Sequence, residues 1–237
     1  MKEKNLEEKR FFWRTKNPHI KLIESRLLKN AFKNINGHKI LEVGCGTGAN
    51  FVFLKDYFSD LTGVDINDEA LAVGRRHVSE AKFLRGKVQE MPFTDEAFDV
   101  VFMRDVLHHI YEENEKKSAL KEMKRVCRQN GRLVIIEPNY KNIIIFFQSL
   151  IRKEEKGLKN SRPEFIKKWL TDTGYRLIKI SEAEPLPLDR LILHYRTGLP
   201  WLGQSFIIRF LFSFFNSMYK ILIPKRLWAY IIFKAEK

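Results

Sequence analysis

Short apolar runs alternate with amphipathic stretches along the central part of the chain. Five runs have the length and composition of buried strands: 38–43, 60–65, 81–85, 97–103 and 131–137. Three intervening stretches repeat apolar residues at helical spacing: 47–57, 67–79 and 113–129. This alternation predicts a doubly wound, mostly parallel α/β sheet with right-handed crossovers. A ligand site is expected outside the carboxyl ends of the strands.

The flanking segments extend the prediction to a sheet of seven strands. Apolar spacing predicts a first helix over 19–35, which Gly37 ends. Farther along, Ser161 is a candidate helix cap with Glu164 three residues later, so a helix is expected to run to Thr173. The two remaining strands are expected at 175–181 and 228–233.

This pattern divides the chain into three parts. A tail and the first helix occupy residues 1–36. The domain that contains the sheet covers 37–184 and 227–237. A helical insertion at 185–226 precedes the last strand and is expected to cover the substrate or to contact a membrane.

Within the insertion, residues 204–223 predict an amphipathic helix. Its polar residues fall on one narrow stripe: Arg209, Ser213, Asn216, Ser217 and Lys220. About 20 residues could span a bilayer, but charges in the middle of the helix disfavour spanning. A helix lying in the membrane interface, with its aromatic side toward lipid, fits the pattern better. A helix packed on the domain with one wet stripe is the alternative.

The charge of the chain favours an anionic partner. Its net charge is +14, from 43 basic and 29 acidic residues, and no acidic residue occurs between Arg190 and Lys234. A field of this sign attracts anionic membranes or other polyanions. The segment 190–234 is therefore a candidate contact with an anionic membrane surface, and general solubility is the simpler alternative.

Cysteine usage and the N-terminus bear on location. The two cysteines, Cys45 and Cys127, are far apart and have no metal-ligand spacing, which argues against a disulfide framework and a zinc site. The charged first residues lead into no apolar segment of the kind found in signal peptides. A cytoplasmic protein is expected, peripheral on the inner face of the membrane if the basic segment binds lipid.

The most informative stretch is the glycine-rich turn that follows the first predicted strand. Gly44, Gly46 and Gly48 stand at alternate positions directly after the apolar run. Glycine permits unusual φ values and lets a ligand approach bare backbone. Asp65 ends the next predicted strand about 20 residues later, where a carboxylate can accept hydrogen bonds from ribose hydroxyls. These features predict a nucleoside pocket.

Two kinds of nucleoside cofactor fit this turn. Gly44, Gly46 and Ala49 satisfy the dinucleotide fingerprint G-x-G-x-x-G/A, so an NAD-dependent dehydrogenase is one alternative. Glu42 lies two residues before the first glycine, where its carboxylate would oppose a pyrophosphate. A carboxylate there suits a ligand with a positive amino group, such as S-adenosylmethionine.

The segment Glu42-Val43-Gly44-Cys45-Gly46-Thr47-Gly48 resembles motif I of the class I S-adenosylmethionine-dependent methyltransferases. Leu61-Thr62-Gly63-Val64-Asp65-Ile66 resembles motif II of that family. Further matching segments follow in order: 91–93, 98–102, 106–110 and 120–139. The pattern is most similar to small-molecule and lipid methyltransferases of the ubiquinone/menaquinone type. The resemblance implies a Rossmann-like fold; in the family a short hairpin usually joins the last two strands, whereas here some forty residues intervene.

The resemblance implies S-adenosyl-L-methionine as the cofactor and assigns a role to several residues. The glycines would let the backbone approach the methionine part of the cofactor, and Glu42 would bind its amino group. Cys45, between Gly44 and Gly46, is a further cofactor-binding candidate. Asp65 would bind the ribose, and Ile66 would contact the adenine face. Relatives often carry Gly-Asp-Ala after the third strand, whereas this chain has Gly86-Lys87-Val88-Gln89. Since lysine cannot accept a hydrogen bond, Val88 or Gln89 is expected to contact the adenine instead.

Three residues after the fourth predicted strand are candidates near the reacting groups. By family position Arg104 faces the carboxylate of the cofactor or the substrate opening; an ion pair with Asp105 is the alternative. His108 is a candidate general base, with His109 less favoured, because imidazole titrates near neutral pH. Alternatively, His108 has no chemical role and alignment of the reactants suffices.

The sequence therefore predicts a methyltransferase that acts on a small-molecule or lipid-linked acceptor. An RNA methyltransferase is less favoured, because no RNA-binding module is recognisable and the aromatic residues cluster with aliphatic ones. A non-catalytic, membrane-associated protein that binds S-adenosylmethionine is the remaining alternative.

Overall fold

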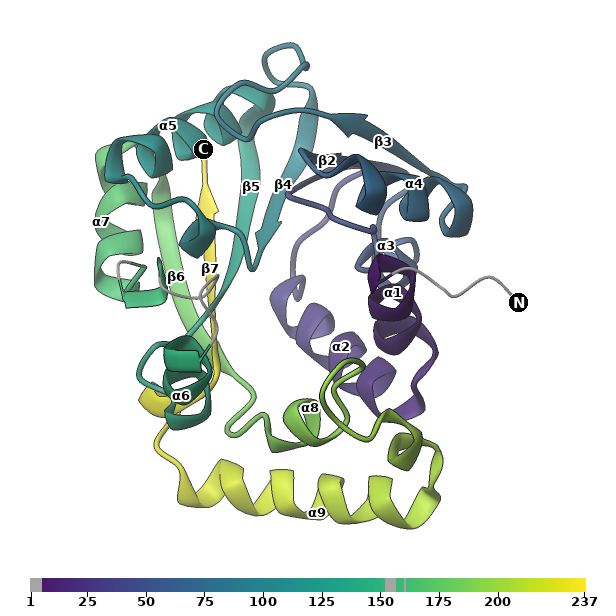
Figure 1. Cartoon of the computed structure of the whole chain (residues 1–237). Helices are drawn as coiled ribbons and strands as arrows, with labels where there is room; N and C mark the ends of the chain where they lie inside the picture. Colours follow the sequence, from purple (N-terminus) through teal and green to yellow (C-terminus); the bar gives the residue numbers. More distant parts are fainter. Residues whose placement is uncertain (1–5, 152–156, 160) are drawn as a thin grey trace.

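The computed structural model describes residues 6–151, 157–159 and 161–237, and its seven strands form one sheet of order β3-β2-β1-β4-β5-β7-β6 (Figure 1). The strands are β1 (Lys39–Val43), β2 (Asp60–Asp65), β3 (Ala81–Arg85), β4 (Phe98–Arg104), β5 (Cys127–Pro138), β6 (Arg176–Ala183) and β7 (Tyr230–Glu236). The pairings among β1 to β5 are parallel, and β7 is antiparallel to both of its neighbours. The predicted doubly wound, mostly parallel sheet is confirmed.

Helices cover both faces of this sheet (Figure 1). They are α1 (Leu6–Lys16), α2 (Pro18–Ala31), α3 (Phe51–Leu54), α4 (Asp68–His77), α5 (Glu113–Val126), α6 (Ile143–Ile151), α7 (Pro163–Asp172), α8 (Leu188–Ile192) and α9 (Phe206–Leu222). Short 3-10 turns are η1 (Leu107–His109), η3 (Pro200–Gln204) and η4 (Lys225–Leu227). Because successive side chains of a strand point to opposite faces, Val100 and Phe102 of β4 pack with α2 and α3, whereas Val101 and Met103 pack with α5 and α7.

Several predicted boundaries change for local physical reasons. The helix expected over 47–57 is reduced to α3, because the backbone up to Asn50 is used by the glycine turn. Ser161 does not cap α7: Arg162 is the cap residue, Pro163 begins the helix, and the buried Ser161 hydroxyl has no partner among the described residues. Residues 1–5 of the predicted N-terminal tail lie outside the described residues.

The insertion folds as α8, η3, α9 and η4, and α9 lies along one end of the molecule, beyond α8 (Figure 1). The predicted helix over 204–223 is confirmed as Phe206–Leu222. No helix within 6–151, 157–159 or 161–237 has the length and apolar composition needed to cross a membrane.

The basic residues of the segment 190–234 differ in their surroundings. Arg190 is buried in ion pairs, and Lys234 on β7 donates to backbone carbonyls of the α2 end. Arg196, Lys220, Lys225 and Arg226 are exposed.

The carboxylate of Glu24 joins segments that are far apart in sequence. It is fully buried on α2 and accepts hydrogen bonds from Arg104 of β4 at 2.7 and 3.1 Å. Arg190 of α8 donates at 2.5 Å, and Arg14 of α1 at 2.5 and 3.1 Å. Burial alone would raise the pKa of Glu24, but the three guanidinium charges outweigh it and hold that pKa well below its usual value.

A second polar contact fixes the insertion to α2. Asp189 of α8 is buried and lies 2.9 Å from His19 Nε2 of α2. The same carboxylate accepts a hydrogen bond of 3.0 Å from Asn216 of α9. Two adjacent residues, Asp189 and Arg190, therefore make buried polar contacts between the insertion and the domain.

We expect Glu24→Gln to lower the free energy of unfolding by about 3–5 kcal/mol, because it leaves three buried guanidinium groups without their common carboxylate. Urea unfolding followed by circular dichroism at pH 7 measures this change. Glu80→Gln, which removes an exposed pair with Lys55 at 3.2 Å, is the control and should cost less than about 1 kcal/mol. Equal effects of the two substitutions would show that the Glu24 cluster contributes no more to the free energy of unfolding than an exposed ion pair does.

Candidate active site

The turn after β1 is shaped by glycines with positive φ. Gly44 and Gly46 have φ of 70° and 52°. The position of Gly44 is crowded, since an added Cβ would come within 2.3 Å of Val106 Cγ2. An added Cβ at Gly46 would meet no atom within 4 Å, so the backbone there faces open space.

That open space is a cavity of about 860 Å³ at the carboxyl ends of the parallel strands. Sequence-predicted residues that line it are Glu42, Gly44, Cys45, Gly46, Asp65, Ile66, Val88, Gln89 and Arg104. They come from β1, β2, β4 and the loops that follow β1, β2 and β3. Two other candidates do not line this cavity: Gly48, whose missing side chain makes room for Phe83, and His108.

Asp65 connects the two halves of the turn. Its carboxylate accepts hydrogen bonds from the backbone N–H of Gly46 at 2.7 Å and of Asn67 at 2.9 Å. Asn67 in turn caps α4 by accepting from two N–H groups of the first helical turn. Ile66, between them, exposes 65% of its surface at the cavity wall, so its side chain can contact a planar ligand.

Glu42 forms the buried end of the cavity. Only 1% of the residue is exposed, and its Oε1 accepts a hydrogen bond from the side-chain amide of Asn50. Its other oxygen, Oε2, is buried and has no hydrogen-bond partner among the described residues. Burial raises the pKa of Glu42 to about 7, and the bond from Asn50 offsets this only in part.

Asn50 links Glu42 to the arginines of the ion cluster. The amide oxygen of Asn50 accepts from Arg14 at 2.5 Å and from Arg104 at 3.1 Å. Arg104 lines the cavity, as the family position implies. It also lies 3.3 Å from Asp105 and so forms the ion pair that was the alternative expectation from sequence. With both guanidinium edges near carboxylates, Arg104 is fixed in place rather than extended into the cavity.

The loop after β3 contributes Lys87, Val88 and Gln89 to the cavity lining.

Cys45 belongs to the glycine turn that follows β1, and its side chain is buried. Burial holds the pKa of the Cys45 thiol well above its usual value, so the thiol stays protonated at neutral pH and serves as a wall rather than as a nucleophile.

A second cavity of about 310 Å³ adjoins the first and shares Arg10, Arg14, Arg104, Asp105 and His109 with it. His108, which lies in η1 and is buried, lines this second cavity. Further lining residues come from α1, α6, the α8 region and β7: Trp13, Ile145, Gln148, Arg190, Tyr195 and Tyr230. The two cavities therefore meet beside β4 and the loop that follows it.

A carboxylate from β5 fixes the ring of His108. Glu137 Oε2 lies 2.7 Å from His108 Nδ1, and Glu137 Oε1 accepts from the N–H groups of Val106 and Leu107. Burial would raise the pKa of Glu137, but His108 and these N–H groups reverse the effect and lower it. An ionised Glu137 requires a proton on Nδ1, so the lone pair of the neutral imidazole is on Nε2.

Sequence reasoning missed the residues that hold Glu42 and Arg104. Asn50 had a local signal, because it lies directly after the glycine turn. Arg14 lay in a charged segment that was expected to be only a tail. Glu24 and Arg190 are separated by 166 residues, and no local pattern links them.

The strand order, the antiparallel β7 and the cavity beside the glycine turn define the fold of the class I S-adenosylmethionine-dependent methyltransferases. A structure described as an S-adenosylmethionine-dependent methyltransferase from Archaeoglobus fulgidus superposes with a TM-score of 0.64 at 19% identity, covering 96% of this chain and 99% of that one. Residues 41–135 match the family described as "Methyltransferase domain". This part of the chain is a class I S-adenosylmethionine-dependent methyltransferase domain.

Two further relatives show how far the likeness extends. The chain is 34% identical to a demethylmenaquinone methyltransferase of Renibacterium salmoninarum over 112 residues, which are 47% of this chain and 46% of the relative. Phosphoethanolamine N-methyltransferase 2 of Haemonchus contortus, solved with S-adenosyl-L-methionine, superposes with a TM-score of 0.65 at 18% identity, covering 96% of this chain and 56% of that one. This chain thus spans about half the length of both relatives.

The residues present fit S-adenosylmethionine on physical grounds. The unpartnered Oε2 of Glu42 offers a buried acceptor for an ammonium group. The bare backbone at Gly46 leaves room for close approach, and the exposed face of Ile66 suits an aromatic base. A cavity of about 860 Å³ is within the range of cofactor sites.

We expect Glu42→Gln to stabilise the cofactor-free protein at high pH. The pKa of Glu42 is 4.5 when unperturbed and about 7 in the fold. The fold therefore binds this proton more tightly, and ionisation costs stability as pH rises from about 4.5 to 7. At pH 8 the substitution should raise the free energy of unfolding by up to about 3 kcal/mol, with little effect near pH 4.5. Urea unfolding at both pH values measures the difference.

The same substitution should weaken S-adenosylmethionine binding, because the ammonium group needs the ionised carboxylate. Affinity of the unaltered chain should increase about fivefold between pH 6 and 7 as Glu42 ionises, and Glu42→Gln should remove that dependence. Isothermal titration calorimetry measures both. The control is Glu90→Gln, an exposed carboxylate lining the same cavity, which should keep the pH dependence. A pH-independent affinity of the unaltered chain would contradict the assignment.

Proposed function

We propose that this protein transfers the methyl group of S-adenosylmethionine to a small-molecule or lipid-linked acceptor. The observation that carries the proposal is the buried, unpartnered oxygen of Glu42 beside the open backbone of Gly46. S-adenosylmethionine, when bound, supplies a methyl group activated by a sulfonium. In this arrangement Glu42 binds the amino group, Asp65 the ribose, and Ile66 with Val88 or Gln89 the adenine. Gly44 and Cys45 line the methionine end.

The second cavity supports an acceptor site. It joins the first beside Arg104 and His109, so a molecule held there meets the cofactor at their junction. Aromatic rings of Trp13, Tyr195 and Tyr230 form part of its wall. Holding the acceptor in line with the methyl group supplies much of the rate in such a displacement.

His108 is the proposed general base. It lines the acceptor cavity, and its bond to Glu137 orients the ring with Nε2 as the basic nitrogen. Glu137 is then a positioning residue, since it acts through His108 and through the N–H groups of the loop. Such a pair would take a proton from the acceptor as the methyl group is transferred.

The relatives support a small-molecule acceptor. Their names specify demethylmenaquinone for the Renibacterium salmoninarum protein and phosphoethanolamine for the Haemonchus contortus protein. The exposed basic residues that remain in the 190–234 segment support contact with an anionic membrane surface, as expected from sequence.

Incubation with methyl-labelled S-adenosylmethionine and fractionated cell extract tests the proposal. We expect label in the lipid or small-molecule fraction. Gly46→Leu should abolish incorporation because its side chain enters the cavity, whereas Gly46→Ala, at the same positive φ, should reduce incorporation less. Binding of S-adenosylmethionine without label in any fraction would favour the non-catalytic alternative, and label in RNA would favour the RNA methyltransferase.

The role of His108 is tested separately. We expect His108→Asn to lower kcat by about 10²–10⁴-fold and to leave the affinity for S-adenosylmethionine unchanged. Glu137→Gln should lower kcat less and shift its pH profile, because it removes the negative charge that lies beside the imidazole of His108. Steady-state kinetics over pH 5.5–9 measures both. A loss in His108→Asn of no more than a fewfold would reject the base assignment and leave the methyl transfer proposal intact.

A further inference from the structure

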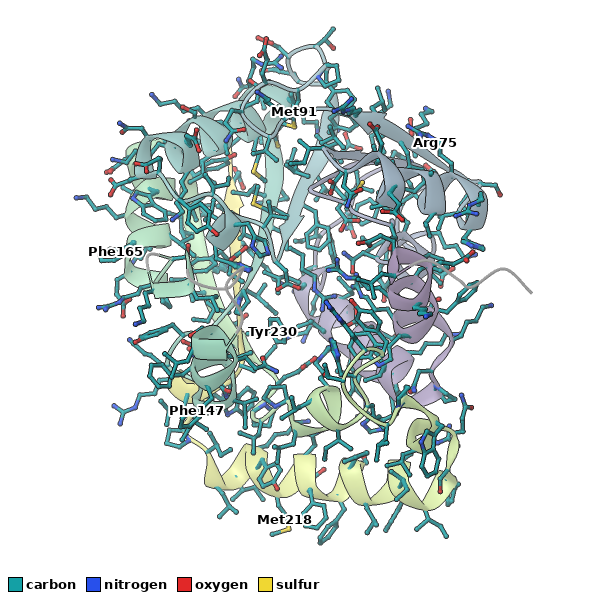
Figure 2. The ribbon with its side chains drawn as sticks, in the orientation of Figure 1. Arg75, Met91, Phe147, Phe165, Met218 and Tyr230 are labelled. Carbon is teal, nitrogen blue, oxygen red and sulfur yellow. The ribbon has the colours of Figure 1, made fainter. Side chains whose placement is uncertain are left out.

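Helix α9 carries a large apolar surface that faces solvent. None of its residues is buried. Exposed apolar side chains run along its whole length: Phe206, Ile207, Phe210, Leu211, Phe214, Phe215, Met218, Ile221 and Leu222. Phe206 and Ile221 expose 73% and 86% of their surface. Figure 2 shows Met218 on the side of α9 that points away from the body of the protein. An exposed patch of this extent marks an interaction surface.

In a soluble protein an amphipathic helix usually turns its apolar side toward the core, whereas α9 turns its most apolar side toward solvent. Its half-buried side includes Arg209, Ser213 and Asn216 from the polar stripe. Asn216 donates to Asp189, and the ring of Phe212 lies 5.0 Å from that of His19 at a tilt of 46°. These contacts turn part of the polar stripe toward the domain, together with Phe212, which packs against Ile20 and Leu193, whereas Ser217 and Lys220 of the stripe are exposed. The side of α9 that is richest in apolar residues therefore faces outward.

A second exposed apolar group lies on α6. Ile143, Phe147 and Leu150 are 60%, 54% and 57% exposed. The start of α6 is tied to the segment after α9, because the Asn142 amide donates to the carbonyl of Leu227 at 2.8 Å. Figures 1 and 2 place α6, with Phe147, near the C-terminal end of α9. The outward apolar residues of α6 and α9 are called the apolar platform below.

The charges around the platform specify the partner. Lys220, Lys225 and Arg226 are exposed at the C-terminal end of α9, and Arg196 is exposed before its N-terminal end. No acidic residue occurs between 190 and 234. A second copy of the chain would bring like charges together, whereas an anionic lipid surface complements them.

We infer that the apolar platform inserts into an anionic bilayer, with α9 lying in the plane of the interface and α6 as a second anchor. The aromatic and aliphatic side chains enter the boundary between headgroups and acyl chains, and the exposed lysines and arginines bind lipid phosphates. The helix is already folded and oriented in the free protein, so binding does not require its formation.

The position of the apolar platform also indicates how an acceptor reaches the site, an inference that rests on the proposed methyl transfer. The second cavity is lined by Ile145 and Gln148 of α6 and by Arg190, His194 and Tyr195 of the segment that leads to α9. Helix α6, which carries part of the platform, and the segment that leads to α9 therefore line the proposed acceptor cavity. An amphiphilic acceptor could keep its apolar part in the bilayer while its polar group enters this cavity.

Sedimentation with sucrose-loaded vesicles tests the inference on the full chain. We expect binding to vesicles with 30% phosphatidylserine and at least tenfold weaker binding to phosphatidylcholine alone at 0.1 M salt. Phe210→Ser/Phe214→Ser/Ile221→Ser should weaken binding at least tenfold, and Phe147→Ser/Leu150→Ser severalfold. Tyr57→Ser, another exposed aromatic position outside α6 and α9, is the matched control and should bind normally.

Charge variants provide the second arm. Lys220→Glu/Lys225→Glu/Arg226→Glu should weaken binding at least tenfold, whereas Lys121→Glu/Lys167→Glu/Lys168→Glu, on α5 and α7, should change it less than threefold. Unchanged S-adenosylmethionine affinity shows that each variant is folded. No vesicle binding, or a dimer in lipid-free sedimentation that the α9 substitutions dissociate, would overturn the inference. Methyl transfer to a water-soluble acceptor would be unaffected by that result, so the two proposals fail separately.

Discussion

The carboxylate of Glu24 is the interaction on which the arrangement of the other parts depends. It lies at zero exposure and accepts from three guanidinium groups, which come from α1, β4 and α8. A buried charge requires partners, and here each partner belongs to a different segment. Helices α1 and α2, the central strand β4 and the insertion are therefore fixed relative to one another by a single side chain. Glu184 balances Arg190 on its far side at 2.6 and 2.7 Å.

The same cluster explains why Glu42 behaves in the opposite way. Arg14 and Arg104 are directed to Glu24 and reach Glu42 only through the amide of Asn50. Their charge therefore lowers the pKa of Glu24, while burial dominates at Glu42 and raises its pKa to about 7. A carboxylate that lacks a cation in the free protein destabilises the fold at neutral pH and is stabilised by a cationic ligand. The ionised Glu42 therefore lowers the stability of the free protein and strengthens the binding of a cationic ligand.

Sequence alone predicted the strands well because each follows from a local apolar run, as at Asp60–Asp65 and Ala81–Arg85. It also placed Glu42, Gly46 and Asp65 together, since the carboxyl ends of neighbouring parallel strands meet at one edge. It could not predict that Arg104 is held by Glu24, a contact across 80 residues with no local pattern. Amphipathic spacing gave α9 its two sides but could not give its orientation, which depends on Asp189 and His19.

The insertion is where the fold and the proposed function meet. Adjacent residues of α8 have two tasks: Arg190 completes the buried cluster around Glu24, and Asp189 holds the polar stripe of α9. The insertion makes buried polar contacts with the domain through Asp189 and Arg190, and its Leu193 and Phe212 pack with Ile20 and Ile23 of α2. The outward apolar residues of α9 take part in none of these contacts and remain available at the surface. A helix packed by its apolar side would have gained more stability from burial. The opposite arrangement indicates that the outward face of α9 serves binding rather than folding.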